Sequence, residues 1–178
     1  MISPVKAVLI AVAATVVAAP CLAQEPKQEP RQEPVGCDKF KWPLDKERAT
    51  LNGTDLPRVA SGAQVAFPIP FATIVGLLPF ADAKLPTPPE RAPKSSDSFA
   101  GYFEAKAPQA GSYKITLSAE GWIDLTQSGN AVKSTAFSGA LGCEGVRKSV
   151  KFSLAAAPFT IELSGVKAEE IKIVISKD

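Results

Sequence analysis

Apolar and polar residues alternate through the C-terminal half of the chain. Side chains of a strand point to opposite faces in turn, so each alternating segment has one apolar face. The segments lie near positions 99–103, 113–117, 123–125, 150–154, 159–163 and 171–175. Strands spaced about ten residues apart, with turn signals between them, are typical of antiparallel sandwiches and barrels. We therefore predict an all-β fold, an antiparallel β-sandwich of jelly-roll or immunoglobulin-like type, in which two sheets bury their apolar faces against each other.

Three other segments complete this pattern. Residues 71–78 are apolar on both faces, which predicts a central strand or one covered on its outer side. Residues 84–97 are rich in proline and predict a long surface loop. Gly129-Asn130 is a hairpin signal.

A short helix is predicted before the strands, within residues 40–53. Pro43 fits the first helical position, Asp45 and Glu47 favour the first turn, and Asn52-Gly53 is a stop signal. The fold class is thus a β-sandwich with one short N-terminal helix.

Residues 1–23 have the order of a secretory signal peptide. Lys6 precedes an apolar stretch from Ala7 to Ala19, and residues 21–23, Cys-Leu-Ala, lie before a cleavage point. The stretch is too short to cross a bilayer as a helix, which takes roughly 20 residues. We expect cleavage after Ala23, a periplasmic or secreted protein, and no transmembrane segment in the mature chain. The alternative is a lipoprotein signal at Cys21, although Pro20 stands where a small residue is usual.

The unit Gln-Glu-Pro occurs three times in residues 24–34. Regular proline and the lack of apolar residues predict a disordered, extended tether over residues 24–36. Residues 37–178 then form a single domain, since the length suits one.

Cleavage removes Cys21 and leaves Cys37 and Cys143. An even pair of cysteines in an exported protein predicts a disulfide. Two thiolates cannot complete a tetrahedral zinc site in a chain with no histidine, so we expect no metal and no cofactor. The bond would pin the N-terminal segment onto the sheet and place Phe137 near the sulfurs.

The charge of the mature chain excludes little and suggests no nucleic-acid partner. Removal of Lys6 leaves 19 of the 20 basic side chains against 18 acidic ones. A net charge this small gives no reason to expect a nucleic acid or an anionic membrane. The oligomeric state stays open.

The sequence offers few catalytic groups. The absence of histidine removes most acid–base and triad arrangements at neutral pH, and no Gly-x-Ser-x-Gly elbow is present. Paired carboxylates remain, but Glu120 and Asp124 lie four residues apart on one strand, too far for a glycosidase pair. A carboxylate-based hydrolase with a partner from another strand stays an alternative, and no catalytic residue is assigned.

Trp122 and Asp124 are the best binding candidates, because residues two apart share one face of a strand. An exposed indole beside a carboxylate could stack on a sugar ring and accept its hydroxyls. The competing interpretation is that Trp122 covers the open end of the sandwich and Asp124 caps a turn or pairs with lysine.

A basic group lies beside Cys143. Arg147 and Lys151 point outward together if the strand is regular, with Lys148 between them. A solvated strand face explains them, and contact with an anion or an acidic glycan is the alternative.

The motifs also carry a resemblance. They are Cys37 with Trp42-Pro43, residues 88–91, Gly111-Ser112-Tyr113, Trp122-Ile123-Asp124, residues 137–139, Cys143 and residues 147–150. Together they resemble a family of small exported alphaproteobacterial proteins of unestablished function. Residues 98–132 also resemble the strand rhythm of sugar-binding jelly-roll modules.

This resemblance implies a Gram-negative periplasmic or secreted location. Some similar sequences carry the name homogentisate 1,2-dioxygenase, an enzyme class that holds iron with two histidines and a carboxylate. The chain has no histidine, so this ligand set is not matched. The sequence predicts a non-enzymatic exported module that binds a glycan or cell-envelope component or has a structural role.

Overall fold

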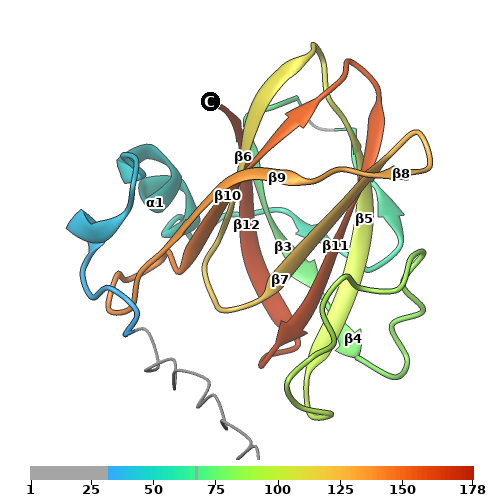
Figure 1. The fold of residues 1–178 in the computed structure, drawn as a ribbon, viewed down its shortest axis with the longest axis horizontal. Helices are drawn as coiled ribbons and strands as arrows, with labels where there is room; N and C mark the ends of the chain where they lie inside the picture. The colour runs from blue at the N-terminus through green and yellow to red at the C-terminus, as the bar shows by residue number, and fades with distance from the viewer. Residues whose placement is uncertain (1–31, 67) are drawn as a thin grey trace, which may run out of the picture. The chain divides into compact units, whose positions relative to one another are not determined.

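The computed structural model describes residues 32–66 and 68–178. The predicted signal peptide, residues 1–23, and the predicted tether as far as residue 31 lie outside this range. The described chain forms two sheets packed face to face (Figure 1). This confirms the predicted all-β sandwich.

The first sheet has the strand order β1-β3-β12-β6-β10-β9. Its strands are β1 (Arg58–Val59), β3 (Phe71–Gly76), β12 (Glu170–Lys177), β6 (Gly111–Leu117), β10 (Lys148–Leu154) and β9 (Ser134–Gly139). The second sheet has the order β2-β5-β11-β7-β8, and β4 also pairs with β5. Its strands are β2 (Ala63–Gln64), β5 (Phe99–Lys106), β11 (Pro158–Val166), β7 (Trp122–Gln127), β8 (Asn130–Ala131) and β4 (Leu78–Pro79).

The sheets are mixed, which corrects the prediction of purely antiparallel pairing. β1 runs parallel to β3, and β2 runs parallel to β5. Both short strands belong to the connection that leaves the helix, touches the first sheet, crosses to the second and returns as β3. Parallel neighbouring strands need such a crossover connection. β1 and β2 have two residues each, too few for an alternating pattern that would predict the crossover.

The core lies between the sheets and consists of the residues whose alternation predicts it. Phe103, Ile115, Leu163 and Ile173 are each 0 % exposed. Ile115 and Ile173 come from β6 and β12 of the first sheet. Phe103 and Leu163 come from β5 and β11 of the second sheet, so both sheets contribute to the centre of the core.

The hairpin between β7 and β8 turns one position earlier than its signal suggests. Gln127 is paired with Asn130, so Ser128 and Gly129 are the two central residues. Both have positive φ, as a type I′ turn requires.

The predicted helix is α1 (Asp45–Leu51), preceded by one 3₁₀ turn, η1 (Cys37–Lys39). Its first residue is Asp45, with Leu44 as N-cap, so Pro43 precedes the helix instead of taking the predicted first helical position. The helix ends at Leu51, before the predicted stop signal Asn52-Gly53. Leu44 and Leu51 pack with Ala72 of β3 and Val174 of β12 on the outer side of the first sheet. This cover explains why β3 is apolar on both faces.

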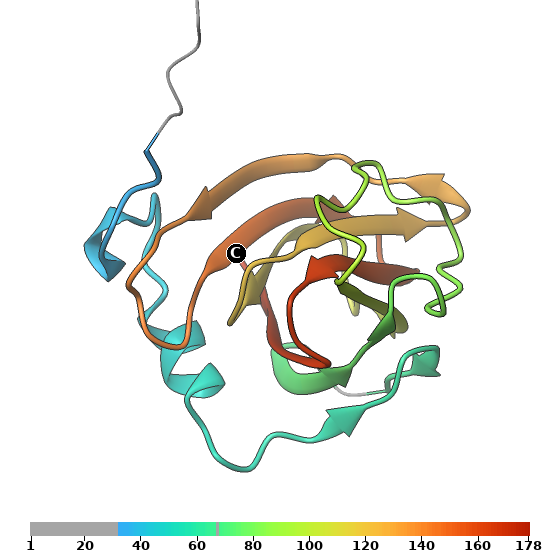
Figure 2. The same ribbon diagram turned by 90° about the horizontal axis from the view of Figure 1, so that it is seen from below.

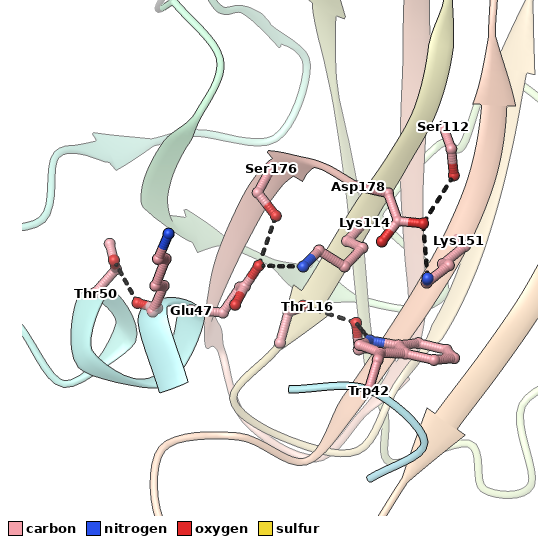
Figure 3. Close-up of polar contacts among 11 residues, drawn as sticks. Trp42, Glu47, Thr50, Ser112, Lys114, Thr116, Lys151, Ser176 and Asp178 are labelled. Carbon is pink, nitrogen blue, oxygen red and sulfur yellow. Dashed lines mark hydrogen bonds and ion pairs between the residues drawn. The ribbon is translucent and has the colours of Figure 1, made fainter. Parts of the chain in front are cut away.

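Polar contacts join α1 to the outer face of the first sheet (Figure 3). Glu47 is 6 % exposed, 2.9 Å from the Lys114 ammonium, and accepts a hydrogen bond of 2.8 Å from Ser176. Burial alone would raise the pKa of Glu47, but its bonds to Lys114 and Ser176 outweigh burial and hold that pKa below its ordinary value.

The disulfide between Cys37 and Cys143 is present, with Cα atoms 4.8 Å apart. It joins η1 to the loop between β9 and β10 and confirms the predicted pairing. Phe137, expected near the sulfurs, is 61 % exposed instead, with the Lys41 ammonium 4.9 Å from its ring centre. Phe137 lies on β9, an edge strand of the first sheet, which leaves most of its ring exposed.

The ordered domain begins slightly before its predicted start at Cys37, because residues 34–36 already form backbone hydrogen bonds with Leu141. Leu141 donates to the Pro34 carbonyl and accepts from the Gly36 amide, each at 2.8 Å. Val35 thereby forms a parallel bridge with Leu141. The last residues of the predicted tether are therefore part of the sandwich, because backbone hydrogen bonds need no apolar side chain. No helix in the described part of the chain is long and apolar enough to cross a membrane.

Reduction of the disulfide should lower the melting temperature. The bond spans 106 residues, and a loop of this length predicts a loss of about 4–5 kcal/mol in the free energy of unfolding. Thermal unfolding of the oxidised protein and of the Cys37→Ser/Cys143→Ser variant measures it. Equal melting temperatures, or free thiols by mass spectrometry before reduction, would contradict the account.

Glu47→Gln should cost about 2–3 kcal/mol at pH 7, because Lys114 keeps a partly buried charge without its partner. The pKa of Glu47 is lowered in the folded protein, so its contribution exists above the unfolded pKa and is lost as the pH falls through the folded pKa. Denaturant unfolding at pH 7 and pH 3 should show this. Glu170→Gln, which breaks an exposed pair with Arg58, is the control and should cost less than about 1 kcal/mol.

Candidate functional site

Trp122 and Asp124 share the outward face of β7, as alternation predicts. The indole Nε1 donates a hydrogen bond of 2.9 Å to Oδ1 of Asp124. Trp122 is partly buried, so its environment lies between the two predicted extremes of an open stacking surface and a core residue.

Two cations lie over the Trp122 ring. The Arg91 guanidinium carbon is 5.4 Å and the Lys148 ammonium 5.0 Å from the ring centre, within the range of cation–π attraction. The Lys148 ammonium also donates to the Gly121 carbonyl at 2.8 Å, and burial lowers the pKa of this lysine. Arg91 is exposed, and no acidic side chain of the described residues pairs with it. We call Arg91, Trp122 and Lys148 the Trp122 site.

Arg147 and Lys151, predicted to form one basic group, lie in different places in the structure. Arg147 forms an ion pair of 2.7 Å with Glu120, just before Trp122 in the chain, and thus borders the Trp122 site. It also pairs with Glu33. Lys151 lies over the Trp42 ring at 4.6 Å and pairs with Asp178 at 2.6 Å, on the outer face of the first sheet (Figure 3). Lys151 is therefore not brought to Trp122.

Sequence reasoning missed Glu162, which lies beside Asp124. Glu162 is in β11, in register with Asp124 of β7 on one side and Tyr102 of β5 on the other. It is 1 % exposed. Its Oε1 accepts a hydrogen bond of 2.5 Å from the Thr87 hydroxyl, while Oε2 and the Ser164 hydroxyl have no hydrogen-bond partner among the described residues.

This burial makes the two carboxyl groups unusual. Burial raises the pKa of Glu162, and the neighbouring charge of Asp124 raises it further. Burial also raises the pKa of Asp124 more than its bonds from Trp122 and the Glu90 amide lower it. A buried and a partly buried carboxyl group that lie side by side, each with a raised pKa, are a feature of functional sites.

The proline-rich loop, residues 84–97, closes this face of the second sheet, as the green segment shows in Figures 1 and 2. Thr87 bonds to Glu162, and the Glu90 amide donates to Oδ2 of Asp124 at 3.2 Å. The next residue, Arg91, lies over Trp122. One loop therefore covers the carboxyl pair and supplies a cation to the indole.

The sequence contains only a weak signal for this arrangement. In "PFTIELSGV" the alternation places Glu162 outward, which normally means a solvated position. What buries it is the proline-rich loop, which lies far earlier in the chain, and no local pattern shows which face of the sandwich that loop crosses.

A separate pocket of about 300 Å³ lies near the end of α1. Its lining includes Leu51, Ile74 and Lys172, and the Lys172 ammonium is already bound to the Leu51 carbonyl at 2.9 Å. None of the predicted site residues lines it. Within residues 32–66 and 68–178, no three acidic or cysteine side chains gather as metal ligands.

Comparison with known proteins finds no matching family model, no similar curated protein and no similar solved structure. The resemblances stated from the motifs therefore stay predictions, and the geometry of the site is the basis for a function.

Thr87→Val should destabilise the protein by about 1 kcal/mol at pH 5, since it removes the hydroxyl that bonds to Glu162. Denaturant unfolding at pH 5 measures this loss. Thr135→Val, which removes an exposed hydroxyl bonded to the Lys151 carbonyl, is the control. Equal effects of the two substitutions would show that Glu162 gains nothing from Thr87.

Proposed function

We propose that this protein is an exported, non-enzymatic β-sandwich module that binds an acidic glycan of the cell envelope at the Trp122 site. The observation that carries the proposal is an indole of fixed orientation beside an exposed guanidinium that has no acidic partner in the described chain. Export follows from the predicted signal peptide and is supported by the disulfide, which oxidising compartments favour.

The chemistry of the site suits an acidic sugar. An indole offers an apolar surface on which a sugar ring can stack, and here the sugar would take the place that a cation, Arg91 or Lys148, now holds over the ring. A guanidinium binds a carboxylate through two parallel hydrogen bonds. The bond from Trp122 to Asp124 holds the ring in place before binding, which lowers the entropic cost of association.

One neighbouring feature supports a binding role: Lys148 adds positive charge at the same ring. Arg147 borders the site, but its charge is already paired with Glu120 and Glu33. Lys151 is left out of the proposed site because it lies with Trp42 on the other sheet.

The second candidate is a carboxylate-based hydrolase, and the Asp124–Glu162 pair is the observation in its favour. A nucleophile or acid must reach the substrate, whereas Glu162 is 1 % exposed beneath Thr87. Binding is therefore preferred. Turnover of glycosides, esters or phenolics that Glu162→Gln abolishes would establish the hydrolase instead.

Dioxygenase chemistry of the homogentisate type is not proposed. The two histidine ligands of that enzyme class have no counterpart in a chain without histidine.

A glycan array should identify uronic-acid-containing or otherwise anionic glycans as ligands. Arg91→Gln should then weaken binding about tenfold or more, because a charge-assisted pair is lost, and Trp122→Ala should remove binding. Calorimetric titration with the best array ligand measures both.

Arg58→Gln is the matched control, because Arg58 is an exposed arginine at the edge of the first sheet that pairs with Glu170. It should bind like the unmodified protein. Equal affinities of the Arg91 and Arg58 variants, or an array without any ligand, would refute the proposed function.

A further inference from the structure

The Asp124–Glu162 pair and the proline-rich loop together form an arrangement that the binding function does not explain. Opposed side chains on neighbouring antiparallel strands have Cβ atoms about 4.5–5.5 Å apart, and like charges at such positions repel each other. Both carboxyl groups point to the same covered face. Two ionised groups there would repel each other in a place with little water.

The contacts of Glu162 show which group is the less suited to a charge. Asp124 accepts one hydrogen bond on each oxygen, from Trp122 and from the Glu90 amide. Glu162 accepts a bond from Thr87 on Oε1, but its buried Oε2 has no partner among the described residues. An ionised oxygen without a donor is costly, and a proton on Oε2 removes that charge.

We propose that the proline-rich loop is a lid over the Trp122 site, held closed while Glu162 carries a proton and released when Glu162 ionises. Release withdraws Thr87 from Glu162 and Arg91 from the indole together, because both belong to this loop. The consequence for the ligand rests on the proposed function: an acidic glycan is bound most tightly at low pH and loses its guanidinium partner as the pH rises.

The charged groups around Glu162 agree with this direction. Asp124 is the charge on β7 and Tyr102 the titratable group on β5. Further along β5, Glu104 accepts a hydrogen bond from Gln64 at 2.9 Å. On the lid, Glu90 is paired with Lys133 at 2.8 Å. None of the described cations forms an ion pair with Glu162, so ionisation is not compensated locally.

The sign of the pH effect follows from the linkage relation. Burial raises the pKa of Glu162 in the closed state, so the closed state binds the proton more tightly than the open state. Closure is fully stabilised below the ordinary pKa of glutamate and is lost as the pH rises through the raised pKa.

Amide hydrogen exchange of the full mature protein without ligand tests the lid. The reporters are the Thr87 amide, which bonds to Glu162, and the Glu90 amide, which donates to Asp124, compared at pH 5 and pH 8 after correction for the intrinsic rates. In the unmodified protein the corrected exchange rates of these amides should be about tenfold or more higher at pH 8 than at pH 5. The Arg48 amide of α1, bonded to the Leu44 carbonyl at 2.8 Å, is the internal control and should show no such change.

Glu162→Gln, which cannot ionise, should show the same loop protection at both pH values. Equal protection of the loop at pH 5 and pH 8 in the unmodified protein would overturn the proposal, whether or not the variant folds. A pH-dependent opening that persists in Glu162→Gln would assign it to another group and would overturn it as well. The exchange experiment contains no ligand, so its result does not depend on glycan binding. If the loop opens with pH as proposed but the protein binds no glycan, only the proposed function is refuted.

Discussion

Charged side chains buried on the outward faces of both sheets determine how this sandwich is covered. A sandwich normally leaves those faces to water, since only the inward faces must be apolar. Here Glu47 of α1 is buried against the partly buried Lys114 of the first sheet, and Glu162 is buried on the second sheet. A buried charge must be paired or neutralised. The segments that cover these faces, the N-terminal segment with α1 and the proline-rich loop, therefore have to supply hydrogen-bond or ion-pair partners as well as exclude water.

The two covers meet this requirement differently. The N-terminal segment packs apolar side chains of α1 on the first sheet, compensates Glu47 with Lys114, and is tied down by the disulfide from Cys37 to Cys143. The proline-rich loop holds the second sheet through hydrogen bonds to Glu162 and Asp124, neither of which forms an ion pair with a cation of the described residues. The first cover is thus a fixed part of the domain, and the second is the one that a change of protonation can move.

Much of the fold could be predicted from the sequence, because local pattern decides it. Alternation placed residues such as Ile115 and Leu163 in the core, and the count of cysteines decided the disulfide. Trp122 and Asp124 share a face because they lie two positions apart. The parallel pairs of β1 and β2 are very short and follow from the path of the chain, which no local pattern shows.

The candidate site was predicted only in part, because its decisive contacts join segments far apart in the chain. Arg91 and Lys148 reach the indole from a loop and from the other sheet, and Lys151, grouped with Arg147 by alternation, lies elsewhere. Glu162 has the sequence pattern of a solvated strand residue, and the loop that covers it comes from a distant part of the chain. Alternation tells which way a side chain points, but not whether water is there.

The ionisation of Glu162 is the central claim, and its side-chain carboxyl carbon reports it directly. A ¹³C NMR titration of selectively labelled protein, with Glu162→Gln to assign the resonance, measures the midpoint. The account predicts a midpoint clearly above the ordinary glutamate value of 4.5, shared by the amides of the proline-rich loop. A midpoint at or below the ordinary value would show that Glu162 is charged beneath a closed loop, and would contradict the account.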